Sequence, residues 1–185
     1  MRIPDPIELS DEIVLLRPFR LDDVDYLYHA VRGSLPELQA WLPWCHAEYC
    51  REEAEQWVES RAAAWHRGTE YSFVIEQHGV EGLVGGCGLN QIDDLRLRAN
   101  LGYWVQTSRT GHGLATAAAR LLARWGLQNV GLQRVEIVAA VDNTASQRVA
   151  QKAGAVHEGV FRRRLRVHGH PHDARIYSLI NEDFD

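Results

Sequence analysis

The amino-acid sequence predicts an α/β protein of the α+β kind, with helices on both faces of one mixed sheet. Three observations lead to this prediction. One strand pattern precedes the first helices, three strand patterns follow them, and strand and helix patterns then alternate up to a final strand pair. The chain has 185 residues, enough to build a hydrophobic core, so we expect a single domain over residues 1–185.

Apolar spacing and turn residues place the elements in order. A helix over residues 22–33 carries Val24, Leu27 and Val31 on one face. Ser34 and Glu37 have the spacing of a capping box, which predicts a short helix after them. The predicted elements are a strand over 13–17, helices over 22–33, 34–41 and 52–67, strands over 71–76, 83–89 and 101–105, a helix over 113–127, a strand over 134–141, a helix over 144–153, and strands over 156–166 and 173–180.

Composition and charge exclude several classes of function. The three cysteines, Cys45, Cys50 and Cys87, lack C-x-x-C spacing, which indicates free thiols in a reducing cytoplasm. Cys87 is expected to be a small core residue, because free cysteine is usually buried. The net charge of -5 gives no reason to expect direct nucleic-acid binding and suits a cationic amine substrate. We also expect no membrane partner, because the sequence shows neither a spanning apolar run nor an opening signal peptide.

The segment over residues 101–116 carries the strongest functional signal. An apolar strand runs through a turn containing Gly111 and Gly113 directly into an amphipathic helix. Glycine allows backbone angles closed to other residues and lets a ligand approach the main chain. The first amides of a helix have no intrahelical acceptor and lie at the positive end of its dipole. The turn therefore predicts a phosphate-binding site.

Two familiar phosphate motifs do not fit this turn. A P-loop requires Gly-Lys-Ser/Thr, and the turn has no lysine. A dinucleotide fingerprint requires a third glycine where Thr116 stands, and three other predicted strands already precede the turn. A glycine-capped helix without any ligand remains an alternative when the glycines are considered alone.

Several motifs together resemble the GNAT acetyltransferase superfamily. Thr110-Gly111-His112-Gly113-Leu114-Ala115 resembles its motif A, although Thr110 departs from the usual first residue. Blocks that resemble the RimJ/RimL-like branch are Leu15-Arg17-Pro18, Gly102-Tyr103-Trp104, Asn143 with Ser146, and Val149 through Gly159. The resemblance implies a mostly antiparallel sheet of six or seven strands with helices on both faces. It also implies acetyl-CoA as the cosubstrate.

The resemblance assigns the cofactor contacts residue by residue. It implies that strand 101–105 parts from strand 134–141 and that the pantetheine arm lies in the gap, with the pyrophosphate on the glycine turn. Asn143 would contact the arm and also suits the N-cap of the next helix. The implied cofactor-binding residues are Tyr103, Trp104, Val105, Thr110, Gly111, His112, Gly113, Leu114, Ala115, Thr116, Asn143 and Ser146.

The implied reaction is direct attack of an amine on a thioester. It needs a base, an oxyanion donor near Val105, and an acid for the departing thiolate. Ser146 is the first candidate for the acid and Tyr177 the second. The carboxylates used as bases by relatives are replaced here by Ala99-Asn100-Leu101 and by Leu165. The remaining candidates for the base are Asp173, His172, Glu158 and a residue of the amino-terminal helices.

The acceptor implied by the RimJ/RimL-like branch is the α-amine of a protein N-terminus. A polyamine or aminoglycoside acceptor and a catalytically silent acetyl-CoA-binding module are the alternatives. Trp41 and Trp44 either wall the acceptor cleft or pack the nearby helices. His168, His170 and His172 have alternate spacing, but Gly-His-Pro favours a hairpin turn, so no metal is expected. We expect a monomer or a homodimer.

Overall fold

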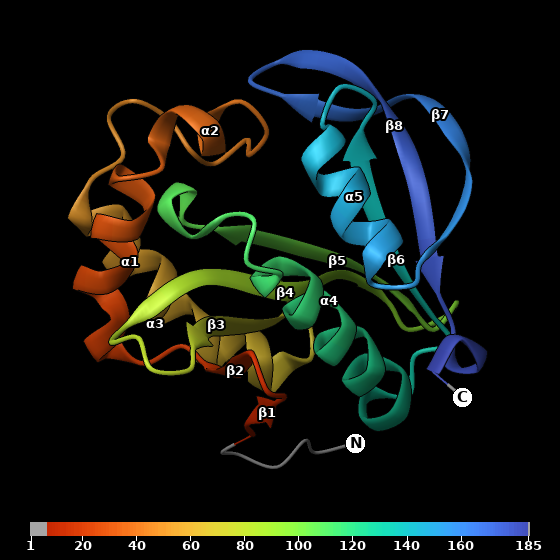
Figure 1. Ribbon diagram of the computed structural model, residues 1–185, viewed down its shortest axis with the longest axis horizontal. Coiled ribbons are helices and arrows are strands. Elements are labelled where there is room, and N and C mark those ends of the chain that lie inside the picture. The colour runs from red at the N-terminus through yellow and green to blue at the C-terminus, as the bar shows by residue number, and fades with distance from the viewer. Residues whose placement is uncertain (1–6, 185) are drawn as a thin grey trace.

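The computed structural model describes residues 7–184 and contains one eight-stranded sheet in the order β1-β2-β3-β4-β5-β6-β8-β7 (Figure 1). The strands are β1 (Leu9–Ser10), β2 (Val14–Pro18), β3 (Tyr71–Gln77), β4 (Leu83–Asp93), β5 (Arg98–Val105), β6 (Arg134–Ala140), β7 (Val156–Val167) and β8 (His170–Leu179). The main helices are α1 (Val24–Arg32), α2 (Leu35–Gln39), α3 (Arg51–Arg67), α4 (Leu114–Trp125) and α5 (Thr144–Lys152).

The predicted mixed sheet is confirmed, because neighbouring strands are antiparallel except for the parallel pair β5 and β6. The strand count differs from the expected six or seven. The additional strand is β1, whose two residues pair with Leu15 and Leu16 of β2. A pair of residues is too short to leave a periodic pattern in the sequence.

Side chains of β3 alternate between two hydrophobic cores, one on each face of the sheet. Phe73 and Ile75 belong to the core that contains the buried face of α4. Val74 belongs to the core that contains residues of α1 and α3. Figure 1 shows α1 and α3 on one side of the sheet and α4 and α5 on the other. Helices on both faces are therefore confirmed.

The predicted capping box at the start of α2 is wrong. Ser34 is the N-cap residue, but its Oγ accepts a hydrogen bond from the amide of Thr107, at 3.0 Å. The Glu37 carboxylate accepts a second bond from the Thr107 hydroxyl, at 3.0 Å. Both side chains therefore contact Thr107, about seventy positions away. Thr107 lies beside α2 because α2 packs near the end of β5, and its amide and hydroxyl donate in place of the amides of α2.

A buried ion pair joins β2 to the turn before α1. Arg17 and Asp23 are 8% and 4% exposed, and two guanidinium nitrogens donate to the two carboxylate oxygens at 2.7 and 2.8 Å. Asp23 also accepts from the amide of Arg20, at 2.7 Å, and Arg17 donates to Glu76 at 2.8 Å. Arg17 belongs to a block that resembles the RimJ/RimL-like branch. Its contacts give it a structural role, which is to hold the turn before α1 against β2.

Asp23→Ala is expected to destabilise the fold by about 3–5 kcal/mol, because it leaves the Arg17 charge buried with only Glu76 beside it. Urea unfolding would measure the change. The matched control is Asp25→Ala, which removes an exposed carboxylate paired with Arg51 at 2.7 Å. Exposed pairs contribute little, so the control should stay close to the wild type. Equal effects of the two substitutions would contradict the structural role of Arg17.

Candidate active site

The sheet parts between β5 and β6 and leaves a cavity there. The two strands pair at Arg98–Arg134, Ala99–Val135 and Asn100–Glu136, and within residues 7–184 they make no further pairs. Residues 101–105 of β5 and 137–140 of β6 then line opposite sides of a cavity of about 1190 Å³. The parting implied by the family resemblance is present. Because β5 pairs with β4 along one edge, main-chain groups on its other edge face the gap.

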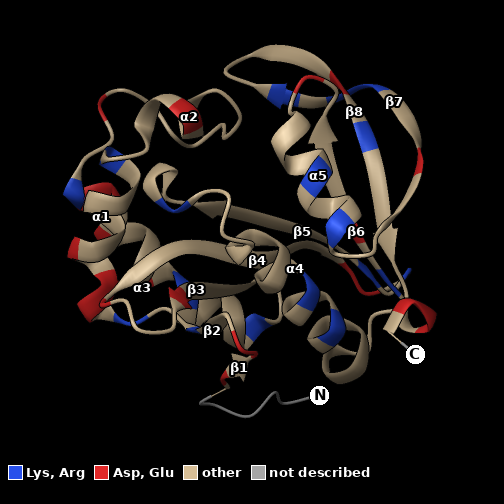
Figure 2. Ribbon diagram, viewed as in Figure 1, with Lys and Arg blue, Asp and Glu red and all other residues tan. Residues whose placement is uncertain are grey.

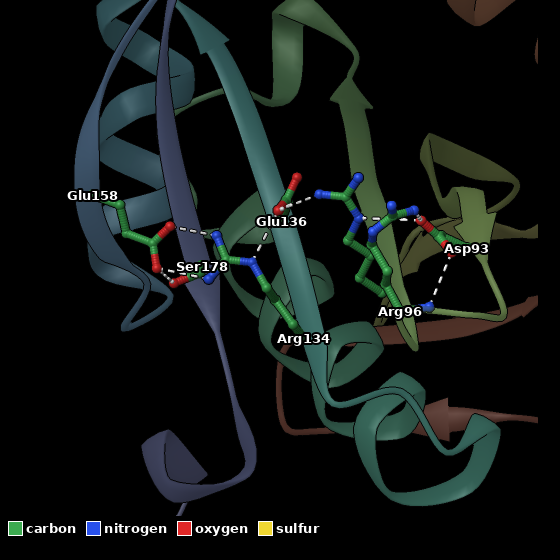
Figure 3. Close-up of polar contacts among 7 residues, drawn as sticks. Asp93, Arg96, Arg134, Glu136, Glu158 and Ser178 are labelled. Atoms are coloured by element: carbon green, nitrogen blue, oxygen red, sulfur yellow. Dashed lines mark hydrogen bonds and ion pairs between the residues drawn. The ribbon is translucent and has the colours of Figure 1, made fainter.

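A ladder of charged side chains holds the closed end of this gap. Figure 3 shows the ladder crossing from Asp93 and Arg96, at the β4–β5 hairpin, to Glu158 of β7. Glu136, in the middle, accepts from Arg98 at 3.4 Å and from Arg134 at 2.9 Å. Arg134 also binds Glu158, which accepts a hydrogen bond from Ser178 at 2.7 Å. The Arg134 guanidinium lowers the pKa of Glu158 to about 2. Glu158, one of the candidate bases, is therefore committed to the ladder and is a poor proton acceptor.

The glycine turn lies at the other end of the gap. Gly111 and Gly113 have φ angles of 82° and 80°, a region that favours glycine. Gly113 is the N-cap of α4, so the first amides of the helix open onto the cavity that Gly113, Leu114 and Ala115 line. Among the described residues, and apart from the local main chain and the adjacent residues, no atom lies within 4 Å of the position that a Cβ would take on either glycine. The turn thus presents bare main chain to a ligand.

Charged residues of both signs line the cavity. Arg109, Arg148 and Lys152 line it around the glycine turn and α5, and Figure 2 shows the basic positions along α5. The carboxylates that line it come from the amino-terminal part of the chain: Glu37, Glu53 and Glu70. Glu37 accepts from Thr107, and Glu70 pairs with Arg61 at 2.7 Å. The basic group suits phosphate groups, and Glu53 suits an ammonium ion.

Most of the predicted cofactor residues meet at this cavity. Those that line it are Tyr103, Trp104, Val105, Thr110, Gly111, Gly113, Leu114, Ala115, Thr116, Asn143 and Ser146. His112 is not among the lining residues; its Nδ1 lies 3.0 Å from the carbonyl oxygen of Thr110. Tyr177, the second candidate for the acid, does not line the cavity either. It is 1% exposed, and its ring packs against His157 at 5.1 Å between centroids, which disfavours it as the acid.

Asn143 and Ser146 are placed by the start of α5. The Asn143 side-chain oxygen accepts a hydrogen bond from the amide of Ser146 at 3.0 Å, which makes Asn143 the N-cap predicted from the sequence. Its amide nitrogen still has donors to offer, and both residues line the cavity. The cap therefore leaves Asn143 able to contact a bound ligand.

Tyr103 brings a second hydroxyl to Ser146. Its Oη donates to the Ser146 carbonyl at 3.0 Å and lies 3.0 Å from Ser146 Oγ. Burial raises the pKa of Tyr103 to about 12, so the phenol stays protonated at neutral pH. Sequence reasoning assigned Tyr103 main-chain contacts and missed this pair. Nothing local signals it, because it joins β5 to α5 across 43 positions.

The candidate bases separate clearly in the structure. Asp173 accepts from the amide of Arg163 at 2.7 Å in the β7–β8 pair, away from the cavity lining. Glu53 of α3 lines the cavity and fits the expectation of a residue from the amino-terminal helices. Its pKa is lowered by the amide of Cys50 and by the side chain of His46, so it remains charged at neutral pH. That charge suits binding of an ammonium ion.

Asn90 and Asn100 line the cavity where β5 leaves β6. The Asn100 amide nitrogen donates to the Asn90 side-chain oxygen at 3.0 Å, and the two residues are cross-strand neighbours on β4 and β5. Asn100 stands in the segment where the family resemblance implies a carboxylate. An amide cannot take up a proton there, although it can hold a water molecule or a polar acceptor group.

Aromatic side chains form part of the cavity wall away from the glycine turn. Trp41 and Trp44 line the cavity, as one of the two sequence hypotheses proposed. The Trp44 ring lies 6.3 Å from the Trp104 ring of β5 and 6.0 Å from the ring of Tyr49. Trp44 is nevertheless 44% exposed, so it stands at the mouth of the cavity.

Three other features considered in the sequence can be compared with the structure. Cys87 is buried and 6% exposed, and burial raises the pKa of its thiol, as expected of a core residue. Among residues 7–184, no three His, Cys, Asp or Glu side chains gather in a geometry suited to a metal ion. His168 instead contacts the carbonyl oxygen of Gln39 at 2.9 Å. In the described part of the chain, no helix has both the length and the apolar character needed to cross a membrane.

A parted sheet that joins a phosphate-binding turn to a pair of hydroxyls is a site for an extended, phosphate-bearing ligand. Comparison with known protein families identifies the class of protein. The family model for the acetyltransferase (GNAT) domain matches residues 14–156. The chain therefore belongs to the GNAT acetyltransferase family.

The similar proteins place the chain beside the RimJ/RimL-like branch. It is 28% identical over 182 residues, 95% of both chains, to the putative ribosomal N-acetyltransferase YdaF of Bacillus subtilis. It is 27% identical over 154 residues, 83% of this chain and 85% of the relative, to the ribosomal-protein-serine acetyltransferase of Escherichia coli.

Two solved structures agree with this placement. A putative ribosomal-protein-serine acetyltransferase from Vibrio cholerae is 27% identical with a TM-score of 0.83, covering 97% of this chain and 99% of that one. Mycobacterium smegmatis RimJ, in complex with CoA-disulfide, is 26% identical with a TM-score of 0.85, covering 97% and 90%. The predicted resemblance is confirmed.

Proposed function

We propose that this chain transfers the acetyl group of acetyl-CoA to the α-amine of a protein N-terminus. The observation that carries the proposal is that one continuous cavity runs through the β5–β6 gap. The glycine turn and the Tyr103–Ser146 pair both line this cavity. The names of the relatives in Bacillus subtilis and Escherichia coli support a ribosomal protein as the acceptor. Such an acceptor would place the reaction in the cytoplasm.

The residues present fit acetyl-CoA. Amides of Gly111 through Ala115 and the nearby Arg109 would hold the pyrophosphate, as helix N-termini hold phosphate groups. Main-chain groups of Tyr103 through Val105 would hydrogen-bond the pantetheine arm along the free edge of β5. Asn143 would contact the same arm from the start of α5. The thioester would then lie beside Ser146.

The transfer needs no covalent enzyme intermediate. The neutral amine attacks the thioester carbonyl, a C–N bond forms, and the oxyanion is stabilised by a β5 amide near Val105. When the C–S bond breaks, the thiolate takes the hydroxyl proton of Ser146. The nitrogen then passes its extra proton to Ser146, directly or through a water molecule, and the Ser146 hydroxyl is restored. Tyr103 Oη donates to the Ser146 carbonyl and lies 3.0 Å from Ser146 Oγ. Its role in this scheme is therefore to orient Ser146.

The acceptor end of the cavity suits a cation beside aromatic side chains. Glu53 would attract the ammonium form of the acceptor, while Trp41 and Trp44 would contact the chain that follows the amine. A polyamine or aminoglycoside would satisfy the same charge but has less need of an aromatic wall. This difference favours a peptide acceptor.

Thiol release from acetyl-CoA, measured with a panel of amines, tests the proposal. We expect turnover with peptides that begin with a free α-amine and none with the same peptides blocked by formylation. Faster turnover with spermidine or an aminoglycoside would replace the peptide by a small-molecule acceptor. Binding of acetyl-CoA without turnover of any amine would support the silent module instead.

A further inference from the structure

Helix α2 bridges the two sides of the active-site cavity. Figure 1 shows α2 between the loop that follows β5 and the tip of the β7–β8 hairpin. On one side, Ser34 and Glu37 bind Thr107. On the other, the carbonyl oxygen of Gln39, the last residue of α2, contacts His168 Nε2 at 2.9 Å.

The contact on the β5 side consists of two hydrogen bonds, one of them to a buried side chain. Ser34 is 1% exposed, and its hydroxyl is the acceptor for the Thr107 amide at 3.0 Å. The Thr107 hydroxyl donates to Glu37 at 3.0 Å. One residue therefore has its main-chain donor and its side-chain donor both directed at α2. A buried polar side chain such as that of Ser34 is costly to leave without a hydrogen-bond partner, which indicates a fixed arrangement.

Thr107 is also the base of the turn that faces the cofactor end. It begins the short 3-10 helix Thr107–Arg109, and its carbonyl oxygen accepts from the Thr110 hydroxyl at 2.9 Å and from the Thr110 amide at 3.3 Å. Thr110 precedes Gly111, and both line the cavity. Three side-chain hydrogen bonds thus connect α2, Thr107 and the glycine turn.

The residues at and after the end of α2 form the acceptor side of the cavity. Leu38, on the helix, and Trp41, Leu42 and Trp44, which follow it, all line the cavity. Leu38 and Leu42 are tied to the start of α2, because the Leu38 amide donates to Ser34 and the Leu42 amide to Leu38, at 3.0 and 2.8 Å. A shift of Thr107 would therefore be transmitted to this wall.

We propose that Thr107 is a positioning residue that couples acetyl-CoA binding to acceptor binding. The inference rests on the proposed function, because it requires the cofactor at the glycine turn and the acceptor beside Trp41 and Trp44. A cofactor that orders the turn fixes Thr107, and Thr107 fixes α2 and the aromatic wall. Each ligand then raises the affinity for the other by the same factor.

The coupling is measured as the affinity for an acceptor peptide with and without saturating CoA, by calorimetry. For the wild type we expect about tenfold tighter peptide binding in the presence of CoA. The ratio of the two peptide affinities, with and without CoA, measures the coupling. Thr107→Val removes the hydroxyl while keeping the shape of the side chain, and it should bring this ratio close to one. Thr107→Ser keeps the hydroxyl and should preserve the wild-type ratio. A reduced ratio with unchanged thermal stability separates positioning from general destabilisation.

Thr107→Val with the wild-type ratio would overturn the proposal, as would a ratio near one in an active wild type. The second result leaves the proposed function standing, since turnover is intact. Failure of the wild type to bind CoA would overturn both. If Thr107→Val does not fold, Glu37→Ala breaks the same hydroxyl bond from an exposed position, and Glu37→Gln, which retains an acceptor oxygen, is its control. An unchanged ratio in Glu37→Ala would likewise overturn the proposal.

Discussion

Gly113→Val is expected to weaken acetyl-CoA binding about 100-fold or more, because loss of about two charge-assisted hydrogen bonds costs on the order of 3–6 kcal/mol. The side chain would project from the N-cap of α4 into the cavity that Gly113 lines. It would occupy the position proposed for the pyrophosphate and separate that group from the helix amides. Calorimetric titration with acetyl-CoA measures the change.

The backbone strain of this substitution can be controlled separately. A side chain at a φ of 80° costs about 1–2 kcal/mol wherever it occurs. Gly131→Val is the matched control, because Gly131 has a φ of 86° and, within the described chain, an equally open surrounding. It should reduce stability to a similar degree and leave acetyl-CoA affinity near the wild-type value. Unchanged affinity in Gly113→Val would place the pyrophosphate elsewhere.

Ser146→Ala is expected to lower kcat by about 100-fold while acetyl-CoA affinity stays close to the wild-type value. The substitution removes the hydroxyl proposed to protonate the thiolate but leaves the amide that Asn143 caps. Thr144→Ala, on the same turn of α5, removes an exposed hydroxyl and is the matched control. Steady-state kinetics with a fixed peptide acceptor would separate kcat from KM.

Tyr103→Phe tests how the two hydroxyls work together. The substitution removes the hydroxyl that contacts both the carbonyl and Oγ of Ser146, and it should lower kcat by about tenfold. If Tyr103 acts by orienting Ser146, the double variant should be no slower than Ser146→Ala alone, because the partner it orients is gone. Multiplicative effects would give Tyr103 an independent role, and an unchanged kcat in Ser146→Ala would remove the acid role of Ser146.

Local patterns predicted the parts of the site that depend on local backbone. The glycine turn could be identified because positive φ angles and a helix N-terminus both leave a signal within a few residues. Asn143 could be identified as a cap for the same reason. The order of helices and strands followed from apolar spacing, which accounts for the confirmed fold class.

Contacts between distant segments could not be predicted in this way. Tyr103 and Ser146 meet because β5 and α5 pack together, and no local rule connects them. Ser34 and Glu37 show the opposite case, in which a local rule predicted a capping box and a distant donor, Thr107, replaced it. Glu158 was a candidate base until its pairing with Arg134 across the sheet was known.

The acceptor site has to distinguish an α-amine from a lysine side chain, which also carries an ammonium group. Glu53, Trp41 and Trp44, which line the cavity, suit the ammonium group of either. An α-amine differs from the lysine amine in lying beside a peptide bond. Polar side chains such as Asn90 and Asn100, at the point where the strands part, could bind that peptide group.

The most direct test is to locate the acetyl group in the product by fragmentation mass spectrometry. The substrate would be a peptide with a free α-amine, an amino-terminal serine and an internal lysine, incubated with the protein and acetyl-CoA. We expect acetylation of the α-nitrogen by the wild type and none by Ser146→Ala over the same time. Acetyl groups on the lysine side chain, or an unmodified peptide despite bound acetyl-CoA, would contradict this expectation.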